Sequence, residues 1–207
     1  MVIIGKDFLK NAREPQRFHE KYQFLQDENI KTLEGYLFPD TYFFSKEINT
    51  EGIIEKMLDN FNKKLTESLR EEIKSQGKTI SEIITMASIL EMEVRNKNDR
   101  EVVSGIFWNR IKNRQPLQSD ITLTYVLGVK KKQYSIEDTK ADSPYNTYLN
   151  KGLPPGPISN PGMDAIIAAL HPKATEYSYF LSDPDTGETV FAKTFEEHKK
   201  NKEAHGL

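Results

Sequence analysis

The sequence contains no cysteine, which excludes disulfides, cysteine nucleophiles and thiolate metal sites. It has no apolar run close to the ~20 residues that a membrane-spanning helix needs, and no signal peptide is visible at its start. Its four histidines, His19, His171, His198 and His205, lack the spacing of metal ligands. We therefore expect no metal and no cofactor.

An excess of positive charge is also absent. The chain has 29 basic and 31 acidic residues and a net charge of -2, so it has no overall field that would collect a polyanion. The lysine runs at 130–132 and 199–200 are interpreted as solvated faces. Nucleic acid is therefore not an expected partner, and 207 residues are enough to bury a core without disulfides.

Helical spacing of apolar residues dominates the rest of the chain, with one hairpin pattern near the end. The expected elements are a long helix over 50–75, a helix from Thr79 to about Val94 opened by a Thr79–Glu82 capping box, a helix over 99–113, a helix from Asp120 to Gly128, a helix from Pro161 to Leu170, a hairpin of 177–182 and 189–192 around Asp185-Thr186-Gly187, and a last helix capped by Thr194. Residues 33–44 are rich in aromatic side chains and predict a strand or an irregular buried segment. We expect an α+β fold: a helix-rich domain with short β-strands or hairpins beside a substrate cleft.

One acidic residue lies where the pattern calls for an apolar one. On the helix from Ile80 to Val94, Glu91 falls in the middle of the apolar stripe, while Glu82 and Glu93 share another side. A buried carboxyl has a raised pKa, as a glycosidic general acid requires. The alternative is a structural Glu91 paired to Arg110 or Arg95. The spacing alone leaves both interpretations open.

Polar and aromatic residues elsewhere are of the kinds that hold sugars. Gln118 and Asp120 lie in one short segment, and Tyr145, Asn146 and Tyr148 lie in a Pro- and Gly-rich stretch over 140–162 that predicts an ordered loop. Asp120 and Glu34 are the candidates for a second polar partner of the acid. Asp120 could instead cap a helix, and Glu34 could instead pair with a backbone amide or an arginine.

Five segments together resemble the endolytic murein transglycosylase family, also called MltG or YceG-like. They are Leu33–Tyr42 (LEGYLFPDTY), Ala87–Glu93 (ASILEME), Asp99–Arg110 (DREVVSGIFWNR), Leu117–Thr122 (LQSDIT) and Ser143–Pro161 (SPYNTYLNKGLPPGPISNP). The resemblance covers roughly residues 33–200. It implies cleavage of the β-1,4 bond between N-acetylmuramic acid and N-acetylglucosamine, with formation of a 1,6-anhydro end, and it identifies Glu91 as the catalytic acid and base.

The resemblance also implies an organisation and a location. Residues 1–32 are then a connector or the end of a preceding, truncated LysM-like region, and 33–207 form the catalytic domain. The expected location is the extracytoplasmic face of the bacterial cell membrane, reached through an N-terminal helix missing from this chain. Glycan strands are the expected partner, with cell-wall synthases as a second. Glu34, Gln118, Asp120, Tyr145, Asn146 and Tyr148 are the expected substrate contacts.

Two other functions fit parts of the sequence. One is a peptidoglycan-binding scaffold module that does not cut, although binding alone would not need a buried acid. The other is an aminodeoxychorismate lyase, a name attached to some relatives of this family. That chemistry needs pyridoxal phosphate on a Schiff-base lysine, and no phosphate-binding motif stands out.

Overall fold

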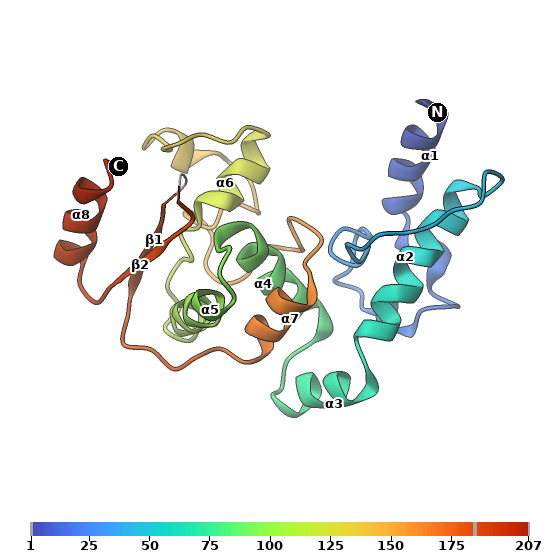
Figure 1. The fold of residues 1–207 in the computed structure, drawn as a ribbon, viewed down its shortest axis with the longest axis horizontal. Coiled ribbons are helices and arrows are strands. Elements are labelled where there is room, and N and C mark those ends of the chain that lie inside the picture. Colours follow the sequence, from blue (N-terminus) through green and yellow to red (C-terminus); the bar gives the residue numbers. More distant parts are fainter. Residues whose placement is uncertain (1, 184–185, 207) are drawn as a thin grey trace.

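The computed structural model describes residues 2–183 and 186–206, which form eight α-helices and one two-stranded antiparallel sheet (Figure 1). The α+β fold class is confirmed. In chain order the elements are α1 (Val2–Ala12), the short 3-10 helices η1 (Pro15–Phe18) and η2 (Gln23–Gln26), α2 (Thr50–Lys64), α3 (Glu67–Ser75), α4 (Ile80–Glu93), α5 (Lys97–Lys112), α6 (Asp120–Leu127), η3 (Asp138–Lys140), α7 (Met163–Leu170), β1 (Tyr179–Ser182), β2 (Thr189–Ala192) and α8 (Phe195–Ala204).

Helix α4 lies at the centre of the molecule and packs against α5, α6 and α7 (Figure 1). The predicted capping box is confirmed: the Thr79 hydroxyl accepts from the Glu82 N–H, and the Glu82 carboxylate accepts from the Thr79 N–H. From Ser81 to Leu90 the helix is buried on nearly every side, with Glu82 exposed. The core therefore fixes α4 firmly, and with it the two acids of its last turn.

The prediction of a single helix over 50–75 is wrong, because α2 ends at Lys64 and α3 begins at Glu67. Leu65 leaves the helical conformation with a ψ of 74°, and the Thr66 hydroxyl caps the new helix by accepting from the Leu69 N–H. The helix predicted over 99–113 begins at Lys97 instead, after the cap Asn96. Apolar residues continue at helical spacing across the first boundary, through Phe61, Leu65 and Leu69, so local capping decides where α3 begins.

Strands β1 and β2 form the predicted hairpin, with Tyr179 opposite Ala192 and Ser182 opposite Thr189. Asp185 of its predicted turn lies outside the described residues. Thr194 caps α8 as predicted. Helix α6 ends at Gly128 as predicted, and the structure shows this glycine in the left-handed conformation.

Residues 33–38 form a buried irregular segment that locks onto the loop before α7. Gly35 has a φ of +92°, and a Cβ there would lie 2.4 Å from the Pro157 ring. The side-chain oxygen of Asn160 accepts from the N–H groups of Gly35 at 2.8 Å and Leu37 at 3.2 Å. Two motifs about 120 residues apart thereby form one structural unit beside α4.

Side chains from residues 1–32 contribute to the same buried cluster as the rest of the chain. Phe24 packs against Tyr36 and Phe61, with ring centroids 6.0 and 4.9 Å away. Within residues 2–183 and 186–206, no helix combines the length and the apolar character needed to cross a membrane.

Candidate active site

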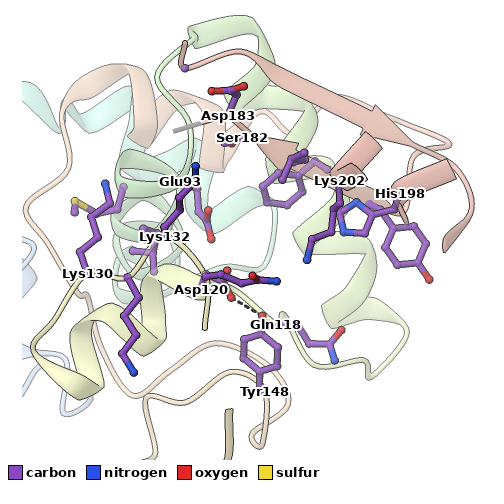
Figure 2. A pocket seen from close by; sticks show the side chains of 18 of the residues that line it. Glu93, Gln118, Asp120, Lys130, Lys132, Tyr148, Ser182, Asp183, His198 and Lys202 are labelled. Carbon is purple, nitrogen blue, oxygen red and sulfur yellow. Dashed lines mark hydrogen bonds between the residues drawn. The ribbon is translucent and has the colours of Figure 1, made fainter. Parts of the chain in front are cut away.

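A cavity of about 380 Å³ lies at the C-terminal end of α4, a size typical of ligand sites. Its walls are the loop before α6, the segment 130–133 after α6, strand β1 and helix α8. Figure 2 shows Glu93 and Asp120 between these walls. Five separate parts of the chain thus converge on the end of the most buried helix.

Glu93, the last residue of α4, places its carboxyl in this cavity. The Ser119 hydroxyl donates to its Oε1 at 2.5 Å, and the backbone N–H of Ile121 donates as well. Burial and the nearby charge of Asp120 together raise the pKa of Glu93 to about 7, although Ser119, Ile121 and Arg110 oppose the shift. Near neutral pH the protonated and the ionised forms of this carboxyl are therefore both populated.

This arrangement predicts that Glu93→Gln stabilises the protein above neutral pH. The pKa of Glu93 rises from an ordinary 4.5 to about 7 on folding, so ionisation costs stability as the pH rises through that interval. Glutamine cannot ionise, and the gain above pH 7.5 should be about 2 kcal/mol, since one pKa unit corresponds to roughly 1.4 kcal/mol and the group is only partly enclosed. Urea unfolding at pH 4.5 and pH 8 measures it. Equal effects at both pH values would contradict a raised pKa.

The loop that carries Gln118 and Ser119 is held in a strained shape. Gln118 has a φ of +50°, which is uncommon for a residue other than glycine and concentrates at functional sites. Its N–H donates to the Thr147 carbonyl at 3.0 Å, and the Ser119 N–H donates to the Thr147 hydroxyl at 3.1 Å. Arg110 donates to the carbonyls of Leu117 and Ser178. These contacts fix the Ser119 hydroxyl against Glu93.

Asp120 and Tyr148 form a second polar pair in the cavity. The Tyr148 hydroxyl donates to the Asp120 carboxylate at 2.5 Å, and burial together with the Asp120 charge raises the pKa of Tyr148. The N-cap of α6 is Ser119, and Asp120 is the first helical residue, so the expectation that Asp120 itself caps the helix is wrong. Its charge instead acts on Glu93.

Glu91 points away from the cavity. Its side chain is 32% exposed, its Oε2 accepts from the Gly162 N–H at 3.1 Å, and it lies 3.8 Å from Arg100. The expectation of a buried, unpaired carboxyl at Glu91 is therefore wrong. The last turn of α4 extends past the core, where a position on the apolar stripe no longer means burial. The alternative of pairing with an arginine fits, although the partner is Arg100 rather than Arg110 or Arg95.

The remaining predicted residues lie outside the cavity wall. The Tyr125 hydroxyl donates to Glu34 at 2.8 Å, and the Tyr125 ring packs 5.0 Å from that of Tyr145. Asn146 is fully buried: its amide N–H groups donate to Thr139 and Ala141, and its oxygen accepts from the Tyr148 N–H. Of the seven residues predicted for the site, the cavity brings together Gln118, Asp120 and Tyr148.

The residues predicted for the site did not include Glu93, Ser119, Arg110 or the segment 130–133, although Arg110 was considered as a partner of Glu91. The helical pattern put Glu93 on another side of α4 than the apolar stripe, and the Ser119 loop covers it only in the folded chain. Gln118 has a left-handed backbone conformation that orients this loop. Glutamine, unlike glycine, does not indicate that conformation in a sequence.

Comparisons with known proteins show the family of the chain. A model of the YceG-like family matches residues 6–204. The endolytic murein transglycosylase of Bacillus subtilis (strain 168) is 45% identical over 181 residues, 86% of this chain and 50% of that protein. The endolytic murein transglycosylase of Streptococcus pneumoniae serotype 2 (strain D39 / NCTC 7466) is 37% identical over 178 residues, 84% of this chain and 32% of that protein.

A 2.6 Å crystal structure of a yceG-like protein from Listeria monocytogenes superposes with a TM-score of 0.85. It is 38% identical to this chain, and the match covers 95% of this chain and 67% of that one. The chain spans about half the length of the B. subtilis relative and about a third of the S. pneumoniae relative.

Proposed function

Because the chain belongs to the YceG-like family, we propose that it carries the catalytic site of an endolytic murein transglycosylase, with Glu93 as both acid and base. The observation that carries this proposal is the Glu93 carboxyl, held in the cavity with a pKa of about 7. An acid that is half protonated at neutral pH can donate a proton and afterwards accept one.

In the proposed reaction Glu93 first protonates the oxygen that joins C1 of N-acetylmuramic acid to the next N-acetylglucosamine. That C–O bond breaks, and positive charge develops at C1 and the ring oxygen. Glu93, now a carboxylate, removes the proton from the C6 hydroxyl of the same muramic acid. The C6 oxygen bonds to C1 and forms the 1,6-anhydro end, so the proton returns to Glu93 and no water is consumed.

The neighbours of Glu93 have distinct roles in this proposal. Ser119 fixes the carboxyl by hydrogen bonding, and Asp120 keeps it protonated before the reaction and stabilises positive charge during it. Gln118 offers an amide to sugar hydroxyl or acetamido groups. Glu91, in contrast, anchors the start of α7 through Gly162, so we propose a structural role in place of the catalytic one expected from the motif.

The chemistry of the cut ends tests the reaction. Purified peptidoglycan is digested in ¹⁸O-labelled water, and the fragments are analysed by mass spectrometry. We expect 1,6-anhydro-muramic acid ends without label. Reducing ends that carry ¹⁸O would mean a hydrolase, and Asp120 would then be the candidate for a second catalytic carboxylate. An absence of cleavage would favour the non-catalytic scaffold module.

Asp120→Asn is expected to move the pH dependence of cleavage. The Asp120 charge raises the pKa of Glu93, so its removal lowers that pKa and deprotonates the acid at a lower pH. The alkaline limb of kcat/KM should shift toward acid by about one pH unit, a typical change for a close carboxylate pair. The pre-steady-state rate of cleavage, measured from pH 5 to 9, locates the alkaline limb of this pH profile. A limb that stays in place would remove Asp120 from the electrostatics of the acid.

The cell-wall location follows from the proposed substrate. We propose that the site acts outside the cytoplasmic membrane, on strands near the synthases that make them, and that the full-length protein is held there by an N-terminal anchor. The division of this chain into a connector over 1–32 and a catalytic domain over 33–207 belongs to the same proposal.

A further inference from the structure

Lysine side chains stand on two opposite walls of the cavity around Glu93. Lys130 and Lys132 come from the segment after α6, and Lys202 comes from α8 (Figure 2). Within residues 2–183 and 186–206, these three ammonium groups have no ion-pair partner. The net charge of the chain is -2, so this local excess of positive charge is not a property of the whole surface.

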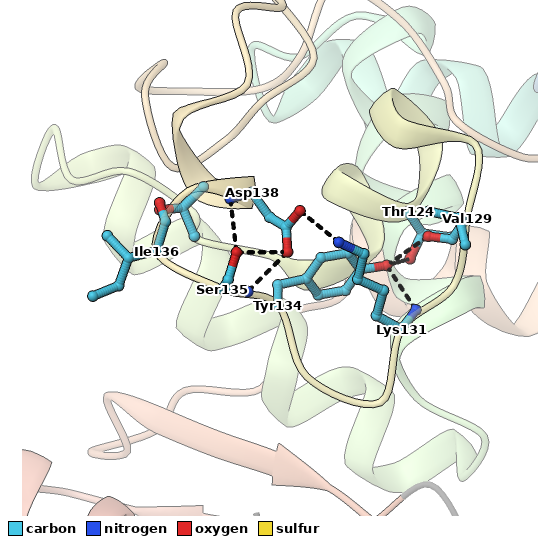
Figure 3. A network of polar contacts seen from close by, with 8 residues as sticks. Thr124, Val129, Lys131, Tyr134, Ser135, Ile136 and Asp138 are labelled. Atoms are coloured by element: carbon cyan, nitrogen blue, oxygen red, sulfur yellow. Dashed lines mark hydrogen bonds and ion pairs between the residues drawn. The ribbon is translucent and has the colours of Figure 1, made fainter.

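The segment with Lys130 and Lys132 has a defined structure. The Tyr134 hydroxyl bonds with Thr124 at 2.6 Å and donates to the Val129 carbonyl at 3.0 Å (Figure 3). Lys131 donates to Asp138 at 2.6 Å, and Asp138 also accepts from Ser135 (Figure 3). The middle lysine of the run is therefore tied to the segment itself, and its two neighbours remain available at the cavity.

The cavity also holds three acids, and none of the ion pairs that they form within the described residues is with Lys130, Lys132 or Lys202. Asp120 accepts from Tyr148 and Asp183 pairs with His205 at 2.9 Å, while burial favours the neutral form of Glu93. Burial lowers the pKa of His198 on the same wall, and the charges of Lys202 and Arg110 lower it further. Lysine side chains that line one cavity without an ion-pair partner among the described residues favour the binding of an anion there.

We propose that Lys130, Lys132 and Lys202 form a subsite for the carboxylates of the peptide stems that muramic acid carries. This inference rests on the proposed function, because murein is the substrate that brings such stems next to the cleaved bond. A neutral glycan would gain nothing from three ammonium groups. Lysine is a point charge on a flexible chain, which suits a mobile peptide better than the fixed fork of arginine does.

Binding, measured separately from cleavage, tests the subsite. Glu93→Gln protein is titrated with soluble, uncross-linked peptidoglycan strands, either native or with their stem carboxylates converted to amides by carbodiimide coupling. The same titrations are made with Lys130→Gln, Lys132→Gln and Lys202→Gln added together. A matched control carries Lys112→Gln, Lys199→Gln and Lys200→Gln, which remove three charges outside the cavity.

We expect the three cavity substitutions to weaken binding of native strands about tenfold. Amidation of the strands should weaken their binding to Glu93→Gln protein that keeps the three lysines by the same factor. The cavity substitutions should have no further effect on amidated strands, and the control should bind native strands as before. Lys→Arg at the same three positions should restore most of the affinity. Equal binding of native and amidated strands, or an equal loss in the control, would overturn the inference. Because the readout is binding, failure of the proposed cleavage reaction would appear separately, as intact strands with unsubstituted protein.

Discussion

Glu93→Gln is expected to reduce strand cleavage by about 1,000-fold or more, in line with the 10²- to 10⁴-fold contribution of a positioned general acid and base. Glutamine keeps the shape and can still bond with Ser119, but it can neither donate the proton to the leaving oxygen nor take one from the C6 hydroxyl. Because one carboxyl serves both steps, no second group is left to replace it. The rate of appearance of new 1,6-anhydro ends measures the loss.

Glu91→Gln is the matched control, since it makes the same chemical change two residues earlier on the same helix. The variant loses a carboxylate that accepts from the Gly162 N–H and lies near Arg100, so we expect it to cost about 1 kcal/mol of stability. Its cleavage rate should stay within about threefold of the parent at a temperature where both are folded. A large loss with Glu91→Gln and none with Glu93→Gln would reverse the assignment.

Gly105→Ala is expected to have the largest effect on stability. Alanine normally stabilises a helix relative to glycine by up to about 1 kcal/mol. At Gly105 in α5, however, a Cβ would lie 2.1 Å from the Lys173 carbonyl oxygen, and the backbone there is fixed by the Lys173 N–H bond to Glu101. We expect a loss of about 3 kcal/mol, the upper end for forced overpacking, measured by thermal and urea unfolding.

Gly5→Ala in α1 provides the comparison, because no atom lies within 4 Å of the Cβ that it would add. That variant should be as stable as the parent or slightly more so. If Gly105→Ala were also neutral or stabilising, residues 173–175 would not pack on α5 as closely as described. Because Arg110 on the same helix supports the Leu117–Ser119 loop, Gly105→Ala should also lower activity before it unfolds the chain.

Most of the fold could be predicted from local signals. The capping boxes at Thr79 and Thr194, the glycine at 128 and the alternating hairpin residues act over a few residues, and each defined its element correctly. The resemblance to the YceG-like family, read from five segments, is confirmed by the family match. The single helix over 50–75 was wrong because apolar spacing alone does not reveal that Thr66 restarts the helix.

The site was harder to predict, because long-range packing decides which acid is enclosed. The helical pattern placed Glu91 inside and Glu93 outside, yet α4 is buried almost all round and its last turn projects beyond the core. In that last turn the neighbouring loops, and not the apolar stripe of the helix, decide which carboxyl is covered. The Ser119 hydroxyl bonds to Glu93, and Glu91 accepts from the Gly162 N–H. Gln118, Asp120 and Tyr148 were predicted because their residue types suit sugars, and they line the cavity, whereas Asn146 has the right type but is fully buried.

The most direct test of the central claim is a titration of the Glu93 carboxyl itself. Protein with ¹³C-labelled glutamate side chains is followed by NMR from pH 4 to 9, and the Glu93 signal is assigned by its loss in Glu93→Gln. We expect a midpoint near 7 that falls when Asp120 is replaced by Asn. A midpoint near the ordinary 4.5 would show that the cavity does not keep this acid protonated, and Glu93 could not be the proton donor at neutral pH.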